Sequence, residues 1–312
     1  MPSMVSQTLE TLQSAFSNLS FKASEPLSSH TYMKSGGPAE IFVVVTKKAD
    51  LENLVIWCEK NQQKYLVLGG MSNSLVPDEG IKGLVINNMV SGSRTIQIDE
   101  NTYSFEVESG TPTNLAVRAS IDQSLEGLEY FLGVPGTIGG AIYNNSHYLT
   151  ELIGADVDQV EVIAKGGIKK IYTKNEMQFA YDYSILQETH EVITTVRFKL
   201  KKGNKAELEQ KAAEATKRRA DTQPLGIPSS GCMFKNPVMP SGLREGAGKL
   251  IDGAGLKGMR IGDAVISDKH ASFILNTGHA TTSDVLKLAE HVKAVVKEKY
   301  GVELEREVFL VG

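Results

Sequence analysis

The chain of 312 residues is 41% hydrophobic and 22% charged, the composition of an ordinary globular protein that is long enough for two domains. Its 33 basic and 37 acidic residues give a net charge of −4, which argues against nucleic acid or an anionic membrane surface as a partner. No apolar run approaches the ~20 residues that span a bilayer, so membrane insertion is not expected.

The first half of the chain alternates between strand and helix patterns. Residues 1–29 are polar, with one modest helical pattern at Leu9, Leu12 and Phe16. After them the residues predict a buried strand at 41–45 and an amphipathic helix at 49–62, then strands at 65–70, 84–88 and 191–200.

The last third begins with a polar, helix-prone segment at 203–224, which is placed to join two domains. A glycine-rich stretch follows and leads to a final helix. A capping box at Thr281 and Asp284 marks its start, and Gly301 marks its end. The whole pattern predicts an α/β or α+β protein with a break near residues 200–225.

The two cysteines lie far apart in the sequence and in different contexts. Cys58 falls on the apolar face of the helix predicted at 49–62, where a thiol is usually a small core residue. Cys232 lies in the glycine-rich part of the chain. Nothing in the sequence calls for a disulfide between them, and we expect a cytoplasmic protein.

Four glycines and a proline fall within nine residues in 133-GVPGTIGGA-141. Glycine permits positive φ and lets backbone N–H groups approach a ligand closely, as phosphate-binding loops require. The spacing fits neither the P-loop of nucleoside triphosphatases nor the G-x-G-x-x-G of Rossmann folds. The residues alone leave two interpretations open, a phosphate cradle and a structural tight turn.

A second glycine loop, 69-GGMSNSLV-76, directly follows a predicted strand and adds Ser72 and Asn73. Small polar side chains of this kind can hydrogen-bond a diphosphate without adding charge, although they are also common in turns. Two such loops in one half of the chain favour a dinucleotide.

Six motifs, in order along the chain, resemble the UDP-N-acetylenolpyruvoylglucosamine reductases, the MurB family of peptidoglycan synthesis. The resemblance runs from about His30 to the C-terminus. It is carried by 30-HTYMKSGGPAE-40, 66-LVLGGMSNSLV-76, 127-GLEYFLGVPGTIGGAIYNN-145, 223-QPLGIPSSGCMFKNP-237, 246-GAGKLIDGAGLKGMRIGDAVISDKHASFILN-276 and 303-ELEREVFLVG-312.

This resemblance implies an α+β fold. An FAD-binding domain of the vanillyl-alcohol-oxidase (PCMH) type, made of two α/β subdomains, would precede a smaller C-terminal α+β domain that binds the substrate. The expected boundaries are an N-terminal extension at 1–29, the FAD-binding domain at 30–203 and the substrate domain at 204–312. The FAD-binding residues that it implies are Gly69, Gly70, Met71, Ser72, Asn73, Val134, Pro135, Gly136, Thr137, Gly139, Gly140, Ala141, Ile142, Asn145 and Ile193.

The activity that the resemblance implies is that of an NADPH- and FAD-dependent UDP-N-acetylmuramate dehydrogenase. NADPH would reduce the flavin, which would then pass hydride to C3 of the enolpyruvyl ether of UDP-N-acetylglucosamine. Addition at C3 drives charge into the carboxylate, so the reaction needs a proton donor at C2 and polarising groups near the carboxylate. By motif position the donor is Cys232 and the acidic partner is Glu307.

The phosphates and uracil of such a substrate need cations and amides. Motif position favours Arg219, Lys235 and Asn236 for this role, ahead of Lys249 and Lys257. The expected partners are therefore a UDP-sugar and NADPH, bound by a monomer.

The chain departs from the family pattern in three places. The family usually has Y-R-x-S, whose arginine polarises the substrate carboxylate, whereas 181-YDYS-184 places Asp182 there and reverses the sign of the charge. Met71 stands where a third glycine is usual, and the small-residue pattern of 143–151, which includes His147, is altered. We interpret His147 as a loop or surface histidine.

These departures leave alternatives open. Another cation could replace the missing arginine, with Arg197, Lys34 and Arg118 as candidates. The chain could instead be an FAD protein of the same fold with a changed substrate, or a non-catalytic nucleotide-binding paralogue.

Overall fold

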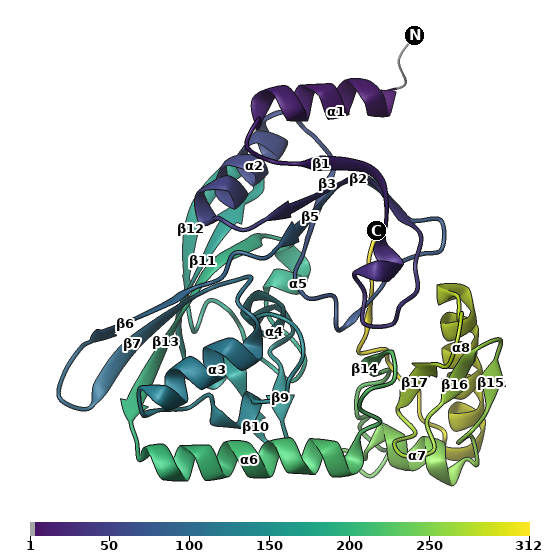
Figure 1. The fold of residues 1–312 in the computed structure, drawn as a ribbon. Coiled ribbons are helices and arrows are strands. Elements are labelled where there is room, and N and C mark those ends of the chain that lie inside the picture. Colours follow the sequence, from purple (N-terminus) through teal and green to yellow (C-terminus); the bar gives the residue numbers. More distant parts are fainter. Residues whose placement is uncertain (1–3) are drawn as a thin grey trace. The chain divides into compact units, whose positions relative to one another are not determined.

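The computed structural model describes residues 4–312 and divides into two compact units (Figure 1). Unit 1 comprises Met1–Ala23, Ile41–Gly70 and Gly83–Arg219, and unit 2 comprises Ser24–Glu40, Met71–Lys82 and Ala220–Gly312. This division differs from the predicted boundaries, because the chain enters unit 2 three times and returns twice to unit 1.

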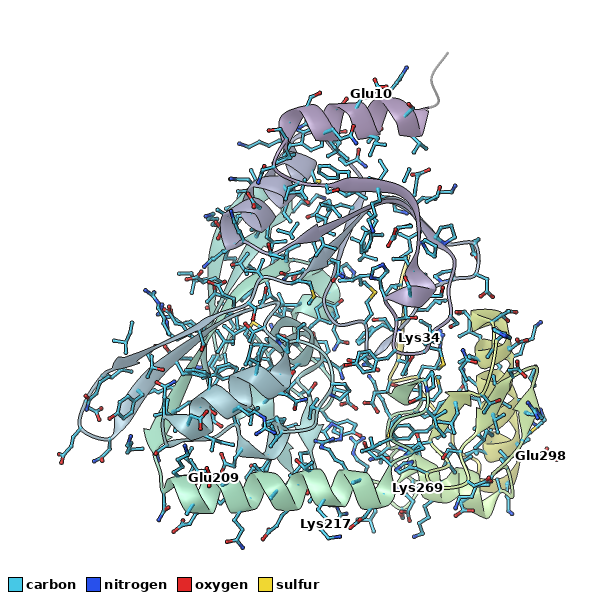
Figure 2. The ribbon with its side chains drawn as sticks, in the orientation of Figure 1. Glu10, Lys34, Glu209, Lys217, Lys269 and Glu298 are labelled. Atoms are coloured by element: carbon cyan, nitrogen blue, oxygen red, sulfur yellow. The ribbon has the colours of Figure 1, made fainter. Side chains whose placement is uncertain are left out.

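The predicted break at residue 203 falls just before one continuous helix, α6 (Lys205–Thr222). Its buried residues Leu208, Ala212 and Ala215 recur at helical spacing on one face. Leu208 and Ala212 belong to a core of unit 1, so most of this helix belongs to that unit. The rest of the helix surface carries exposed charges, among them Glu209 and Lys217 (Figure 2).

A four-stranded sheet forms the first part of unit 1, in the order β1 (Phe21–Pro26), β2 (Pro38–Val45), β5 (Ile81–Asn88), β3 (Tyr65–Leu68). Strands β3 and β5 are parallel. Helix α2 (Lys48–Lys60) buries Leu51, Leu54, Val55 and Cys58 in a core that it shares with these strands. Helix α1 (Met4–Ala15) adds Leu12 to the same core.

A six-stranded sheet forms the second part of unit 1. Its order is β12 (Ile168–Thr173), β11 (Val157–Ala164), β13 (Val192–Lys202), β7 (Thr102–Glu108), β6 (Ser93–Gln97), and β8 (Leu125–Glu126) also pairs with β13. Helices α3 (Thr113–Asp122) and α4 (Ile138–Asn144) contribute to its core, which is separate from that of the first sheet. The two cores correspond to the two predicted α/β subdomains.

Unit 2 contains an antiparallel sheet in the order β14 (Ser229–Cys232), β17 (Phe273–Asn276), β16 (Ala264–Ile266), β15 (Arg260–Ile261). Helices α7 (Ala247–Gly253) and α8 (Thr282–Tyr300) pack their apolar faces into its core. A parallel pair of short strands, β4 (Ser74–Leu75) and β18 (Phe309–Leu310), joins two distant parts of the sequence. The remaining elements are β9 (His147–Tyr148), β10 (Glu151–Leu152), α5 (Leu186–Thr189) and 3₁₀ turns at Leu27–Ser29, Glu129–Phe131, Ile153–Asp156 and Lys165–Gly167.

Each strand and helix predicted from the sequence is confirmed, with shifts of a few residues at the ends. The capping box of α8 is also confirmed: Thr281 accepts from the Asp284 backbone, the Asp284 carboxylate accepts from the Thr281 backbone, and Gly301 ends the helix with a φ of 69°. Within residues 4–312, no helix combines the length and the apolar character needed to cross a membrane.

Replacement of Thr281 by Ala should destabilise the protein by about 1 kcal/mol, because the cap of α8 loses its side-chain acceptor. Thermal unfolding would measure this as a lower Tm. Thr11→Ala is the matched control, since the Thr11 hydroxyl only bonds back to the Gln7 carbonyl on the exposed side of α1. An unchanged Tm for Thr281→Ala would contradict the assigned cap.

Candidate active site

The two glycine loops lie against each other in unit 1. A Cβ atom built on Gly70 would lie 2.8 Å from the Gly136 Cα, and one on Gly69 would lie 2.3 Å from the Thr137 Oγ1. A side chain at Gly70 would separate the two loops, and one at Gly69 would collide with the Thr137 side chain. Gly70 is therefore required by the close approach of two backbones, in addition to any ligand.

A third segment, residues 109–111, binds the 133–141 glycine loop, and the three segments 69–70, 109–111 and 136–140 together are called the cradle. The Gly139 N–H donates to the Ser109 carbonyl at 2.7 Å, and the Ile138 N–H donates to the Thr111 carbonyl at 2.9 Å. The backbone of Gly69, Gly70 and Gly139 remains partly exposed, and Gly140 is exposed. Unit 1 thus offers accessible backbone from two glycine loops, supported by a third, buried segment at 109–111, which fits a dinucleotide such as FAD.

Aromatic and cationic side chains border the cradle, and the aromatic ones were not predicted from the sequence. Tyr130 and Tyr148 stack with ring centroids 6.0 Å apart, and the Arg219 guanidinium lies 5.0 Å from the Tyr148 ring centroid. A Cβ on Gly133 would lie 3.3 Å from the Arg219 Cδ. Arg219, predicted to bind substrate, therefore lies beside the glycine loop. In the sequence, the tyrosines on both sides of that loop could have indicated an aromatic border of the site.

Several predicted cofactor residues have side chains that face inward. Ala141, Ile142 and Ile193 belong to the core of the six-stranded sheet, so they could reach a cofactor only through their backbone. Asn145 is fully buried, where it donates to the Ala180 carbonyl at 2.7 Å and accepts from the Gly154 N–H at 3.0 Å. Its side chain fastens two loops to the end of α4.

Unit 2 brings Cys232 and Glu307 onto neighbouring stretches of backbone. The Glu307 N–H donates to the Met233 carbonyl at 2.9 Å, and the Lys235 N–H donates to the Glu305 carbonyl at 3.0 Å. Both Cys232 and Glu307 are partly exposed. The C-terminal segment is thereby paired with the chain that follows β14, although 75 residues of sequence separate the two predicted residues.

The second glycine loop continues from unit 1 into unit 2 at Met71. The Asn73 Nδ2 donates to the Glu307 carbonyl at 3.3 Å, which places Asn73 beside the predicted acid. Ser72 is partly exposed. Met71 is 4% exposed and has a φ of 50°, a conformation that favours the glycine usual in the family.

The predicted substrate residues of unit 2 differ in their surroundings. Lys235 is partly exposed next to the paired backbone described above. The Asn236 Oδ1 accepts from the Ala247 N–H at 2.9 Å, at the start of α7. Binding of substrate by either residue stays a prediction.

Asp182, at the position of the family arginine, is fully buried in unit 1 and its Oδ1 lies 3.0 Å from the Nδ1 of His147. The interpretation of His147 as a plain surface or loop residue is therefore incomplete, because its ring is bound to a buried carboxylate. The three candidate replacement cations have other surroundings: Arg197 binds Glu106 and Gln159, Arg118 is exposed on α3, and the Lys34 Nζ donates to the Ser29 carbonyl (Figure 2).

The fold and the cradle define an FAD-binding protein with a separate C-terminal domain. Residues 39–170 match the FAD binding domain family, and residues 223–311 match the C-terminal domain of UDP-N-acetylenolpyruvoylglucosamine reductase. The chain belongs to the UDP-N-acetylenolpyruvoylglucosamine reductase family. The predicted family and α+β fold class are thereby confirmed.

Similar proteins cover nearly the whole chain. A UDP-N-acetylenolpyruvoylglucosamine reductase of Caldanaerobacter subterraneus is 39% identical over 288 residues, which is 92% of each chain. That of Enterococcus faecalis is 36% identical over 304 residues, 97% of each. The crystal structure of the enzyme (MurB) from Thermus caldophilus superposes with a TM-score of 0.76 at 33% identity, covering 94% of this chain and 99% of that one.

Proposed function

We propose that this protein reduces the enolpyruvyl ether of UDP-N-acetylglucosamine to UDP-N-acetylmuramate in peptidoglycan synthesis, with FAD as its cofactor and NADPH as the electron donor. The observation that carries the proposal is the similarity to reductases of this name over 92% or more of the chain, across both the FAD-binding and the C-terminal domain. A monomer in the cytoplasm remains the expectation.

Bound FAD would supply the hydride chemistry, and the chain's own residues supply binding and proton transfer. The backbone of Gly69, Gly70 and the 133–141 loop would line the diphosphate and flavin, although the Ile138 and Gly139 N–H groups in that loop already donate to the Thr111 and Ser109 carbonyls. Cys232 delivers the proton to C2, with Glu307 as its acidic partner. Arg219 and Lys235 provide positive charge for the substrate phosphates.

Two anaerobic measurements test the proposal on the purified protein. It should be yellow or take up added FAD, and NADPH should bleach the flavin. Addition of the enolpyruvyl sugar nucleotide should then restore the oxidised spectrum. A bleached flavin that this substrate does not reoxidise would favour a flavoprotein with a different substrate, and failure to bind FAD would favour a non-catalytic paralogue.

A further inference from the structure

Asp182 combines three unfavourable features at one position. Its φ of 51° lies in the left-handed region, which aspartate tolerates better than most residues but which glycine favours. Its side chain is fully buried, and within residues 4–312 its Oδ2 has no hydrogen-bond partner. Costs of this kind collect at functional sites rather than in ordinary turns.

The turn that holds Asp182 does not itself require an aspartate. Ala180 and Tyr183 exchange backbone hydrogen bonds of 3.1 and 3.2 Å, which closes a tight turn with Asp182 at its third position. Glycine or asparagine would satisfy that geometry without placing a carboxylate in the interior. The carboxylate therefore has to be explained by what it binds.

The side chain that it binds is His147. The Nδ1 of His147 is 3.0 Å from the Asp182 Oδ1, and the ring also lies 5.0 Å from that of Tyr181. The imidazole stays 22% exposed, and its Nε2 has no hydrogen-bond partner among residues 4–312. A buried carboxylate is costly unless it is hydrogen-bonded, and the Nδ1 contact satisfies one of its two oxygens and fixes the orientation of the ring. A protonated ring would then present a fixed, positively charged Nε2–H donor.

Hydrogen bonds connect the segments of His147 and Asp182 to α4, the helix that begins in the 133–141 glycine loop. Helix α4 has seven residues and is about 10 Å long. At its end, the Ser184 Oγ donates to the Tyr143 carbonyl at 2.7 Å, and Asn145 binds the Ala180 carbonyl. These bonds hold the turn of Asp182 against the end of α4, from which the chain runs directly to His147.

The neighbour of His147 extends this connection to the glycine loop. Tyr148 lies under the Arg219 guanidinium, which in turn borders Gly133. His147 and Asp182 therefore belong to the same group of unit 1 segments as the flavin cradle.

We propose that His147 binds the substrate carboxylate through its Nε2–H and that Asp182 is the positioning residue that orients the ring. This inference rests on the proposed function. Hydride addition forms a C–H bond at C3 and moves the C2=C3 electron pair toward the carboxylate, before a proton from Cys232 adds at C2. A cation at the carboxylate stabilises that transient charge. The Asp182 carboxylate then orients the His147 ring and does not itself face the substrate carboxylate.

Calorimetry of two sugar nucleotides tests the contact without turnover. His147→Gln should weaken the binding of UDP-N-acetylmuramate by about 10- to 100-fold, because a charged hydrogen bond is lost. The binding of UDP-N-acetylglucosamine, which lacks the carboxylate, should not change. His291→Gln, at an exposed histidine of α8, is the matched control and should alter neither affinity.

Kinetics and a conservative variant separate charge from structure. In His147→Gln, flavin reduction by NADPH should be preserved, and reoxidation by the enolpyruvyl substrate should slow by about 10²- to 10³-fold. His147→Arg should recover part of both losses, because it keeps the charge. Asp182→Asn, which suits the same turn, should weaken the preference for the carboxylate-bearing nucleotide in the same direction.

Three results would overturn the inference: an unchanged carboxylate preference in His147→Gln, an equal loss of both nucleotides, or no advantage of His147→Arg over His147→Gln. The wild-type protein separates this failure from failure of the proposed function. If it neither binds the nucleotides nor is reoxidised by the substrate, the function itself is wrong. If it does both and the variants do not differ from it, only the role of His147 is wrong.

Discussion

Replacement of Cys232 by Ala should slow reoxidation of the flavin by the enolpyruvyl substrate by about 10²- to 10⁴-fold, the usual contribution of a positioned proton donor. Reduction of the flavin by NADPH should stay within about twofold of wild type, because that half of the reaction needs no proton at C2. Anaerobic stopped-flow absorbance of the flavin resolves the two halves. Cys232 is suited to the role because it is partly exposed at the end of β14.

The second cysteine provides the control. Cys58 is fully buried on α2, and burial together with the nearby Glu59 raises the pKa of its thiol to about 12. Cys58→Ala should change neither half-reaction, whatever it costs in stability. Cys232→Ser should keep appreciable activity, since a hydroxyl can still donate a proton. Equal losses in both halves for Cys232→Ala would show that the thiol has a structural role.

Replacement of Gly70 by Ala should raise the dissociation constant of FAD by at least about tenfold, equivalent to 1.4 kcal/mol. The new methyl group would lie 2.8 Å from the Gly136 Cα and 3.3 Å from its carbonyl carbon, so the two loops must move apart. Backbone cannot rotate away as a flexible side chain can, and the cradle would lose its shape. Fluorescence titration of the apoprotein with FAD measures the effect.

Gly92→Ala is the matched substitution in the same unit. Its new methyl group would meet only the Glu108 Cγ, at 3.8 Å, which is an ordinary contact. FAD affinity should therefore not change. A folded Gly70→Ala protein that binds FAD as tightly as wild type would contradict the assignment of this contact to the cofactor site.

The sequence was most informative where function is encoded in short segments. Both glycine loops, the capping box of α8 and the motif around Cys232 were visible as local patterns, because each depends on residues only a few positions apart. The family resemblance then gave these segments a chemistry. Strands β1, β6 and β12 were missed because most of their residues are exposed and give no strong alternating pattern. Strands β7 and β11 were missed although β7 alternates Tyr103, Phe105 and Val107 with polar residues.

The pairing of His147 with Asp182 could not be predicted in the same way. The two residues are 35 positions apart, and their contact depends on a tight turn, a left-handed residue and three side-chain bonds at the end of α4. The sequence shows that position 182 has the opposite charge to the family arginine. The replacement cations predicted from it were Arg197, Lys34 and Arg118. The histidine that contacts Asp182 is His147, which lies in the atypical segment 143–151. Only the fold shows that His147 and Asp182 are in contact.

The parallel pairing of β4 with β18 has a consequence for biosynthesis. Residues 74–75 emerge from the ribosome well before their strand partner at 309–310, which follows after every residue of unit 1 has been made. The core of unit 2 likewise combines Met33 and Leu75 with side chains beyond residue 232. Unit 2 therefore cannot complete its core until Val308 has been made, whereas unit 1 has all of its residues by position 219. For the same reason, a fragment that begins at residue 220 would lack part of its own core and should not fold alone.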